Sequence, residues 1–89
     1  MIEFPIEDSL DLHTFHPRDV KDLVTHWLGE VQSRGFAEVR IIHGKGTGTL
    51  RHIVHSVLDR HPAVLEYHLA DAGRGGWGAT IVRIRLPNS

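Results

Sequence analysis

Four segments of the chain carry the hydrophobic patterns of β-strands. Ser-Leu-Asp-Leu-His at residues 9–13 alternates apolar and polar positions, with Leu10 and Leu12 expected to face inward. Three further segments, one β-branched and largely buried and two alternating, predict strands at residues 37–42, 64–69 and 79–86.

Two other segments repeat their apolar residues at helical spacing. The first is expected to begin at Pro17, whose fixed φ suits a first helical position, and to stop at Gly35. Its apolar stripe, with Trp27 as a core residue, consists of Val20, Leu23, Val24, Trp27, Leu28 and Val31. The second helix is predicted from about Leu50 to Arg60, and His61-Pro62 ends it. Its inward residues are Leu50, Ile53, Val54, Val57 and Leu58.

The element order β-α-β-α-β-β predicts an α/β fold, specifically an α+β two-layer sandwich. Right-handed crossovers place the first three strands parallel, adjacent or one apart, and the last two strands are close enough in sequence to pair antiparallel. We therefore expect a mixed four-stranded sheet with two helices on one face. Residues 1–8 are expected to form an extended lead-in to a single domain at 9–89, and 89 residues allow only a thin core.

Composition narrows the classes of function. The chain has no cysteine, which excludes disulfides and thiolate metal sites, and no apolar run approaches the roughly 20 residues of a membrane span. The formal net charge is -1, yet two stretches, 39–58 and 72–89, contain basic residues and no acid. These stretches fit a small phosphate-contacting patch, with scattered solvated charge as the alternative. An export signal would begin with basic residues, whereas this chain has Glu3, Glu7 and Asp8 there, so no export signal is expected.

The first motif pairs Asp11 with His13 on one predicted strand. Residues two apart on a strand point to the same face about 7 Å apart, so the carboxylate can orient an imidazole for general acid–base chemistry. The alternative is an aspartate that caps the following turn beside an exposed histidine.

The second motif is a glycine loop, His-Gly-Lys-Gly-Thr-Gly-Thr at 43–49, between a strand and a helix. Its glycines let the backbone approach a ligand, and the helix N-terminus offers free N–H groups to an anion. The position of Lys45 does not match a Walker loop, and the glycine spacing does not match the dinucleotide fingerprint. The pattern favours a phosphate cradle flanked by Lys45 and Arg51, with a turn that needs positive φ as the alternative.

The third motif is Gly-Arg-Gly-Gly-Trp-Gly-Ala-Thr-Ile-Val at 73–82. Its glycines predict close backbone approach or a flexible hairpin tip. Arg74 is a candidate phosphate contact, and Trp77 either stacks on a base or covers the small core.

In this order and spacing, the three motifs resemble the signature segments of the Smr (small MutS-related) domain. The resemblance runs from about Ser9 to Leu86 and fits a stand-alone member, as Met1 and the short tail also suggest. It implies a fold like the C-terminal domain of a bacterial translation initiation factor. It also implies a cytoplasmic protein that binds RNA or DNA, with links to DNA repair, DNA nicking and RNA cleavage, including on stalled ribosomes. Where many members have a glycine after the first motif, this chain has Thr14 and then Phe15, and a β-carbon there is expected to narrow the approach to His13.

The resemblance and the motifs together predict an endonuclease that needs no metal or other cofactor, because Asp11 has no acidic companion in any motif. RNA is favoured over DNA because its 2′-hydroxyl supplies the nucleophile. Asp11, His13 and His43 are the expected catalytic residues. The expected nucleic-acid contacts are Gly44, Lys45, Gly46, Gly48, Arg51, Arg74 and Trp77.

Two other functions fit the same residues. One is a non-catalytic module that binds nucleic acid or the ribosome, and the other is a binder of a small phosphate or nucleotide. His52 and His55 have a metal-binding spacing, but we interpret them as a surface pair. No membrane partner is expected, and a monomer is expected with oligomers left open.

Overall fold

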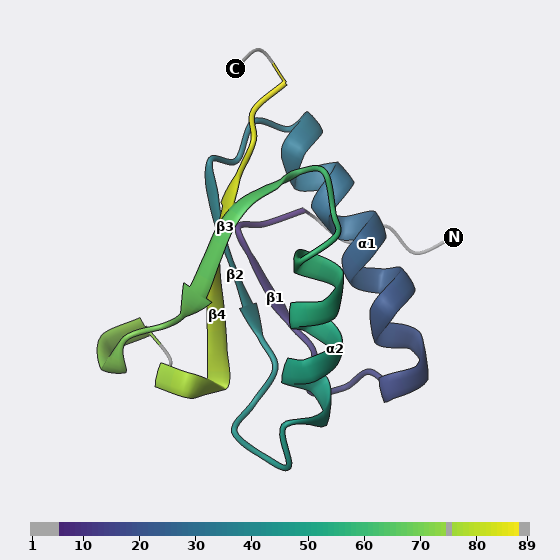
Figure 1. Ribbon diagram of the computed structural model, residues 1–89, viewed down its shortest axis with the longest axis vertical. Helices are drawn as coiled ribbons and strands as arrows, with labels where there is room; N and C mark the ends of the chain where they lie inside the picture. The colour runs from purple at the N-terminus through teal and green to yellow at the C-terminus, as the bar shows by residue number, and fades with distance from the viewer. Residues whose placement is uncertain (1–5, 75, 88–89) are drawn as a thin grey trace.

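Four strands form one mixed sheet in the computed structural model, which describes residues 6–74 and 76–87 (Figure 1). The strands are β1 (Ser9–Asp11), β2 (Glu38–Ile42), β3 (Val64–Leu69) and β4 (Ala79–Ile84). Their order is β1-β2-β4-β3, with β1 parallel to β2 and β4 antiparallel to both of its neighbours. The predicted mixed sheet and the antiparallel final pair are confirmed.

Both helices cover the same face of this sheet (Figure 1). They are α1 (Pro17–Ser33) and α2 (Thr49–Leu58), and each follows a strand at the same end of the molecule. The His16 side chain caps α1 by accepting a hydrogen bond from the Arg18 N–H. Helix α2 ends two residues earlier than predicted, and β4 likewise stops at Ile84 instead of residue 86.

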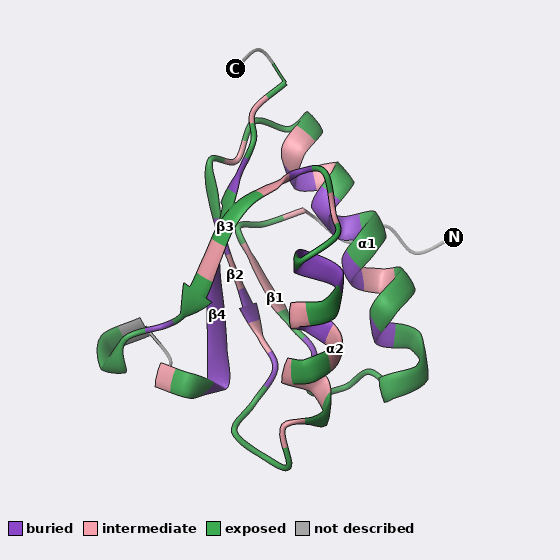
Figure 2. Ribbon diagram, in the orientation of Figure 1, coloured by how far each residue is buried: buried purple, intermediate pink, exposed green. Residues whose placement is uncertain are grey.

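The core lies between the helices and the sheet, where buried residues line the facing surfaces of both layers (Figure 2). Only 5% of the Trp27 surface is exposed, which confirms Trp27 as a core residue. The helices contribute Val20, Val24, Trp27, Leu28, Val31, Val54, Val57 and Leu58 to this cluster, and the strands and the turn after β1 contribute Leu12, Val39, Ile41, Val82 and Ile84. Burying this cluster is the main source of stability in so small a domain.

The opposite face of the sheet carries a second, much smaller apolar cluster. Ala79 and Ile81 of β4 lie there with Ala70, and Ile42 of β2 packs against them. Because side chains alternate along a strand, Asp11 of β1 falls on this same face, directly opposite Ile42 in the register. The first motif thus begins on the side away from the helices.

Residues 6–8 precede β1 without helix or strand, and the rest of the predicted lead-in, residues 1–5, falls outside the described residues. Within the described part of the chain, neither helix has the length and apolar character to cross a membrane.

Candidate functional site

The three sequence motifs meet at one end of the sheet, where β1 and β2 finish and β4 begins (Figure 1). The N–H groups of His43 and Gly44 both donate to the Gly78 carbonyl, at 3.0 and 2.8 Å, and join the glycine loop to the third motif. The Leu12 N–H donates to the Ile42 carbonyl and brings the end of the first motif alongside. The N-termini of α1 and α2 lie at this same end.

A pocket of about 310 Å³ opens between the glycine loop and the start of α1. It is lined by Pro17, His43, Gly44, Gly46, Thr47, Gly48, Thr49, Leu50 and Arg51. The positive ends of two helix dipoles therefore border one hollow, which favours an anion there.

Asp11 holds His13 through two hydrogen bonds. Its Oδ1 accepts the backbone N–H of His13 at 3.0 Å and lies 2.8 Å from Nδ1 of the same residue. The backbone bond, followed by the ring contact, lowers the pKa of the Asp11 carboxyl. The carboxylate thus closes the turn and also contacts the ring, and acid–base chemistry by His13 stays a prediction. The turn begins at once, so β1 ends at Asp11 instead of residue 13.

Lys45 and Trp77 form an exposed part of the site. Lys45 Nζ lies 5.7 Å from the centre of the Trp77 ring, and 61% of the Trp77 surface is exposed. A β-carbon on Gly78 would lie 3.1 Å from Lys45 Cγ and 3.5 Å from the Gly44 carbonyl carbon, so glycine allows this packing. Trp77 therefore leaves its ring available to a ligand and does not cover the core.

Arg51 folds back over the start of α2. Gly48 caps this helix with a φ of 90° and has no side chain to accept a hydrogen bond, and the Thr49 N–H donates to Thr47 Oγ1 at 3.4 Å. A β-carbon on Gly48 would lie 2.9 Å from Arg51 Nη2, which shows how closely the guanidinium approaches. The positive φ at Gly44 and Gly48 confirms the tight turn, and Arg51 adds a cation to it.

His43 is buried, with 6% of its surface exposed, and it lies on the helix side of the sheet. Its Nδ1 contacts the Gly44 carbonyl at 3.1 Å, and its Nε2 lies 2.8 Å from Thr80 Oγ1. His55 of α2 places its own Nε2 2.8 Å from the same hydroxyl. The structure thus brings Asp11 and His13 together, while both ring nitrogens of His43 are engaged elsewhere.

These contacts fix the direction of each hydrogen bond. A carbonyl only accepts, so His43 Nδ1 carries the hydrogen, and the neutral ring leaves Nε2 as an acceptor. Thr80 O–H therefore donates to His43 and accepts from His55 Nε2–H. Burial is the largest cause that lowers the pKa of both imidazoles, which keeps them neutral.

Sequence reasoning missed Thr80 and misplaced His55. The interpretation of His52 and His55 as a surface pair is wrong for His55, which is half-buried, bonded to Thr80, and 4.8 Å from the Tyr67 ring. The signal was present in α2, because His55 stands three residues before the buried Leu58 and so lies on the same side of the helix. Among the described residues, no three His, Asp or Glu side chains group closely enough to hold a metal ion. The Arg74 side chain, predicted as a phosphate contact, lies outside the described residues.

Acid is expected to destabilise the protein through His43 and His55. Because folding lowers both pKa values below the ordinary 6.5, the unfolded chain binds more protons. The two imidazoles therefore contribute fully to the free energy of unfolding above pH 6.5. This contribution is lost as the pH falls below 6.5 toward the pKa values of the folded state. Arg51 opposes protonation of both rings, and Asp59 favours it at His55.

Titration of the two imidazoles by NMR checks this expectation. Both midpoints should lie below those of the same residues in the urea-unfolded chain. A midpoint for His43 at or above the unfolded value would contradict it.

Residues 10–85 of this chain match the sequence model of the Smr domain family. Endonuclease MutS2 of Clostridium botulinum (strain 657) is 40% identical over 80 residues, which cover 90% of this chain and 10% of that protein. Endonuclease MutS2 of Thermomicrobium roseum is 36% identical over 81 residues, with 91% and 10% covered. The chain therefore spans about a tenth of the length of the curated relatives it matches.

Two solved structures share the fold. The Smr domain of Thermus thermophilus MutS2 aligns with a TM-score of 0.83 and 33% identity over 89% of this chain and 99% of that one. YdaL, a stand-alone small MutS-related protein from Escherichia coli, aligns with a TM-score of 0.83 and 28% identity over 93% of this chain and 68% of that one. The α+β fold with its mixed sheet is thus the Smr domain fold, and the chain belongs to the Smr domain family.

Proposed function

We propose that this chain binds RNA at the glycine-loop end of its sheet and cleaves the phosphodiester backbone. The observation that carries the proposal is the Asp11–His13 pair, with a 2.8 Å contact, at the same end of the sheet as Lys45 and the N-terminus of α2. The relatives named Endonuclease MutS2 support a nucleic-acid substrate.

His13 is the general base in this proposal. Its Nδ1–H donates to Asp11, which leaves Nε2 as a lone-pair acceptor for the proton of a 2′-hydroxyl. The O2′ then attacks the adjacent phosphorus, and the bond from phosphorus to the 5′-oxygen breaks. That oxygen takes a proton from solvent, so the products are a 2′,3′-cyclic phosphate and a 5′-hydroxyl end.

The glycine loop supplies the phosphate contacts in this proposal. Backbone N–H groups at Gly46 and Gly48, together with Lys45 and Arg51, stabilise the charge that develops on the phosphate oxygens. Trp77 offers its exposed ring to a base. His43 was expected to act as a catalytic group, and we now assign it to holding the loop because both of its nitrogens are already bonded.

A non-catalytic nucleic-acid-binding module is the second candidate, and one observation favours it. The side chains of His13 and Asp11 are 75% and 48% exposed, so water screens the pair and weakens the influence of the carboxylate on the ring.

End-group analysis of cleaved RNA tests the proposed chemistry. End-labelled single-stranded RNA and supercoiled plasmid DNA are incubated with the protein in the presence of a chelator. RNA ending in cyclic phosphate and 5′-hydroxyl groups is expected, and the Asp11→Ala/His13→Ala variant should produce none. RNA with 5′-phosphate ends would rule out attack by the 2′-hydroxyl. Binding of RNA without cleavage would favour the non-catalytic nucleic-acid-binding module.

A further inference from the structure

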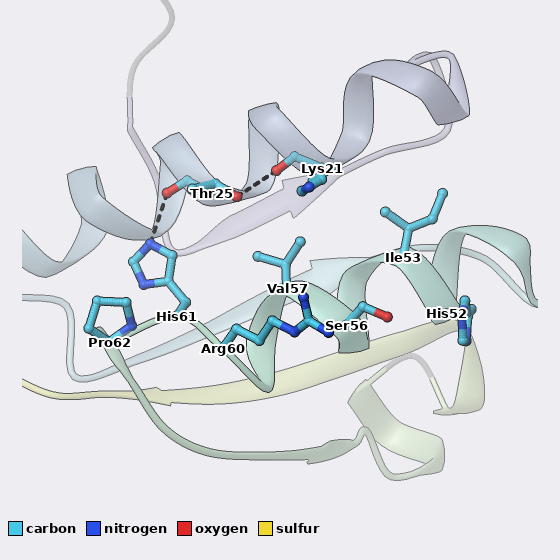
Figure 3. A pocket seen from close by; sticks show the side chains of 9 residues that line it. All are labelled: Lys21, Thr25, His52, Ile53, Ser56, Val57, Arg60, His61 and Pro62. Atoms are coloured by element: carbon cyan, nitrogen blue, oxygen red, sulfur yellow. Dashed lines mark hydrogen bonds between the residues drawn. The ribbon is translucent and has the colours of Figure 1, made fainter.

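A pocket lies in a groove between α1 and α2, and none of its lining residues belongs to the three motifs (Figure 3). Its volume is about 550 Å³, within the range of sites that hold a small molecule or a nucleoside. Ile53 and Val57 of α2 form an apolar floor, and Lys21 of α1 faces Arg60 of α2 across it. The function proposed above makes no use of this groove.

The groove is positively charged and its cations are not neutralised. Neither Lys21 nor Arg60 forms an ion pair with any residue that the structure describes, and no carboxylate lines the pocket. The chain as a whole has a net charge of -1, so this local excess is a property of the groove. Such a surface attracts a polyanion.

One end of the groove is closed by His61. Its Nδ1 accepts the Ala63 N–H at 3.0 Å, so its Nε2–H donates to the Thr25 carbonyl, also at 3.0 Å (Figure 3). This bond ties the turn after α2 to α1.

The other end leads to the glycine-loop pocket. Pro17 lines that pocket and Lys21 lines the groove, and residues four apart are neighbours on one helix face. On α2, Leu50 and Arg51 line the pocket, and Ile53 follows in the groove. The two hollows therefore occupy consecutive turns of the same two helices.

We propose that the α1–α2 groove is an extension of the nucleic-acid site, in which a bound single strand of RNA continues from the glycine loop. Lys21 and Arg60 contact its phosphates, and the apolar floor at Ile53 and Val57 receives the face of one base. Charge complementarity and continuity with the glycine-loop pocket favour this occupant. The inference rests on the RNA binding proposed above.

Salt-dependent binding to a labelled single-stranded RNA of about twelve nucleotides tests the groove. The variant Lys21→Ala/Arg60→Ala should bind about tenfold more weakly. The slope of log K against log salt should become shallower by about 0.7 for each cation removed. The control Arg34→Ala/Arg85→Ala removes the same charge from exposed residues outside the pocket, so it should keep the slope and nearly all the affinity. Circular dichroism confirms that each variant is folded.

The outcomes separate the two proposals. If the wild-type chain binds no RNA, both fail. If the wild-type chain binds RNA and the variant Lys21→Ala/Arg60→Ala keeps its affinity and salt slope, only the proposal that RNA occupies the groove is excluded. If the groove variant loses affinity for poly-glutamate and keeps its affinity for RNA, the groove is a protein-docking site and the proposal is overturned.

Discussion

Replacing His13 with alanine should lower the rate of RNA cleavage by about 10²- to 10⁴-fold, the usual contribution of a general base. RNA affinity should change by less than about twofold, because an exposed ring paired within its own turn contributes little to holding the strand. The expected signature is a fall in kcat at nearly constant KM, which marks a group acting in the transition state. Single-turnover cleavage and fluorescence anisotropy measure the two quantities separately.

The variant Asp11→Asn refines the result. Asparagine keeps an oxygen that can accept the His13 N–H, so the turn survives, but the amide no longer stabilises a charged ring. Cleavage should fall at least about tenfold, by the logic of the aspartate in a catalytic triad. The control His68→Ala removes an exposed histidine of β3, and it should cleave at the wild-type rate. Full activity in His13→Ala would exclude His13 as the base.

The fold was largely predictable because its hydrophobic periods are clear. The apolar stripe beginning at Val20 predicted α1, and the alternation at 64–69 predicted β3 with its observed bounds. The position of β4 between β2 and β3 is set by tertiary pairing, which the topology rules left open. The near-continuous apolar run in β4 is typical of a central strand, and the exposed Leu65 and Leu69 mark β3 as an edge.

The site was harder to predict than the fold, for a physical reason. Asp11 and His13 lie two residues apart, so their contact is local and follows from sequence spacing. Thr80 meets His43 across 37 residues and His55 across 25, and such contacts depend on how the helix lies over the sheet. The contact between Lys45 and Trp77 is of the same kind, because it joins two loops.

Thr80→Val should lower the free energy of unfolding by about 2–4 kcal/mol, although valine has nearly the same shape. The substitution leaves His43 Nε2 without a donor and His55 Nε2–H without an acceptor, and each orphaned buried group costs about 1–3 kcal/mol. Water reaches the half-buried His55 and limits its share. Urea unfolding monitored by circular dichroism gives the difference.

The variant Thr80→Ser separates the hydroxyl from the methyl group. Serine keeps the hydrogen-bond chain and loses one buried methyl, so its cost should be near 1 kcal/mol. NMR of the imidazole nitrogens should show His43 as the Nδ1–H tautomer and His55 as the Nε2–H tautomer in the wild type and in Thr80→Ser. The His43 tautomer should become mixed in Thr80→Val, because no donor then holds Nε2. If valine proves as stable as serine, the chain from His55 to Gly44 does not hold the loop, and the glycine loop must be organised by its backbone bonds to Gly78 alone.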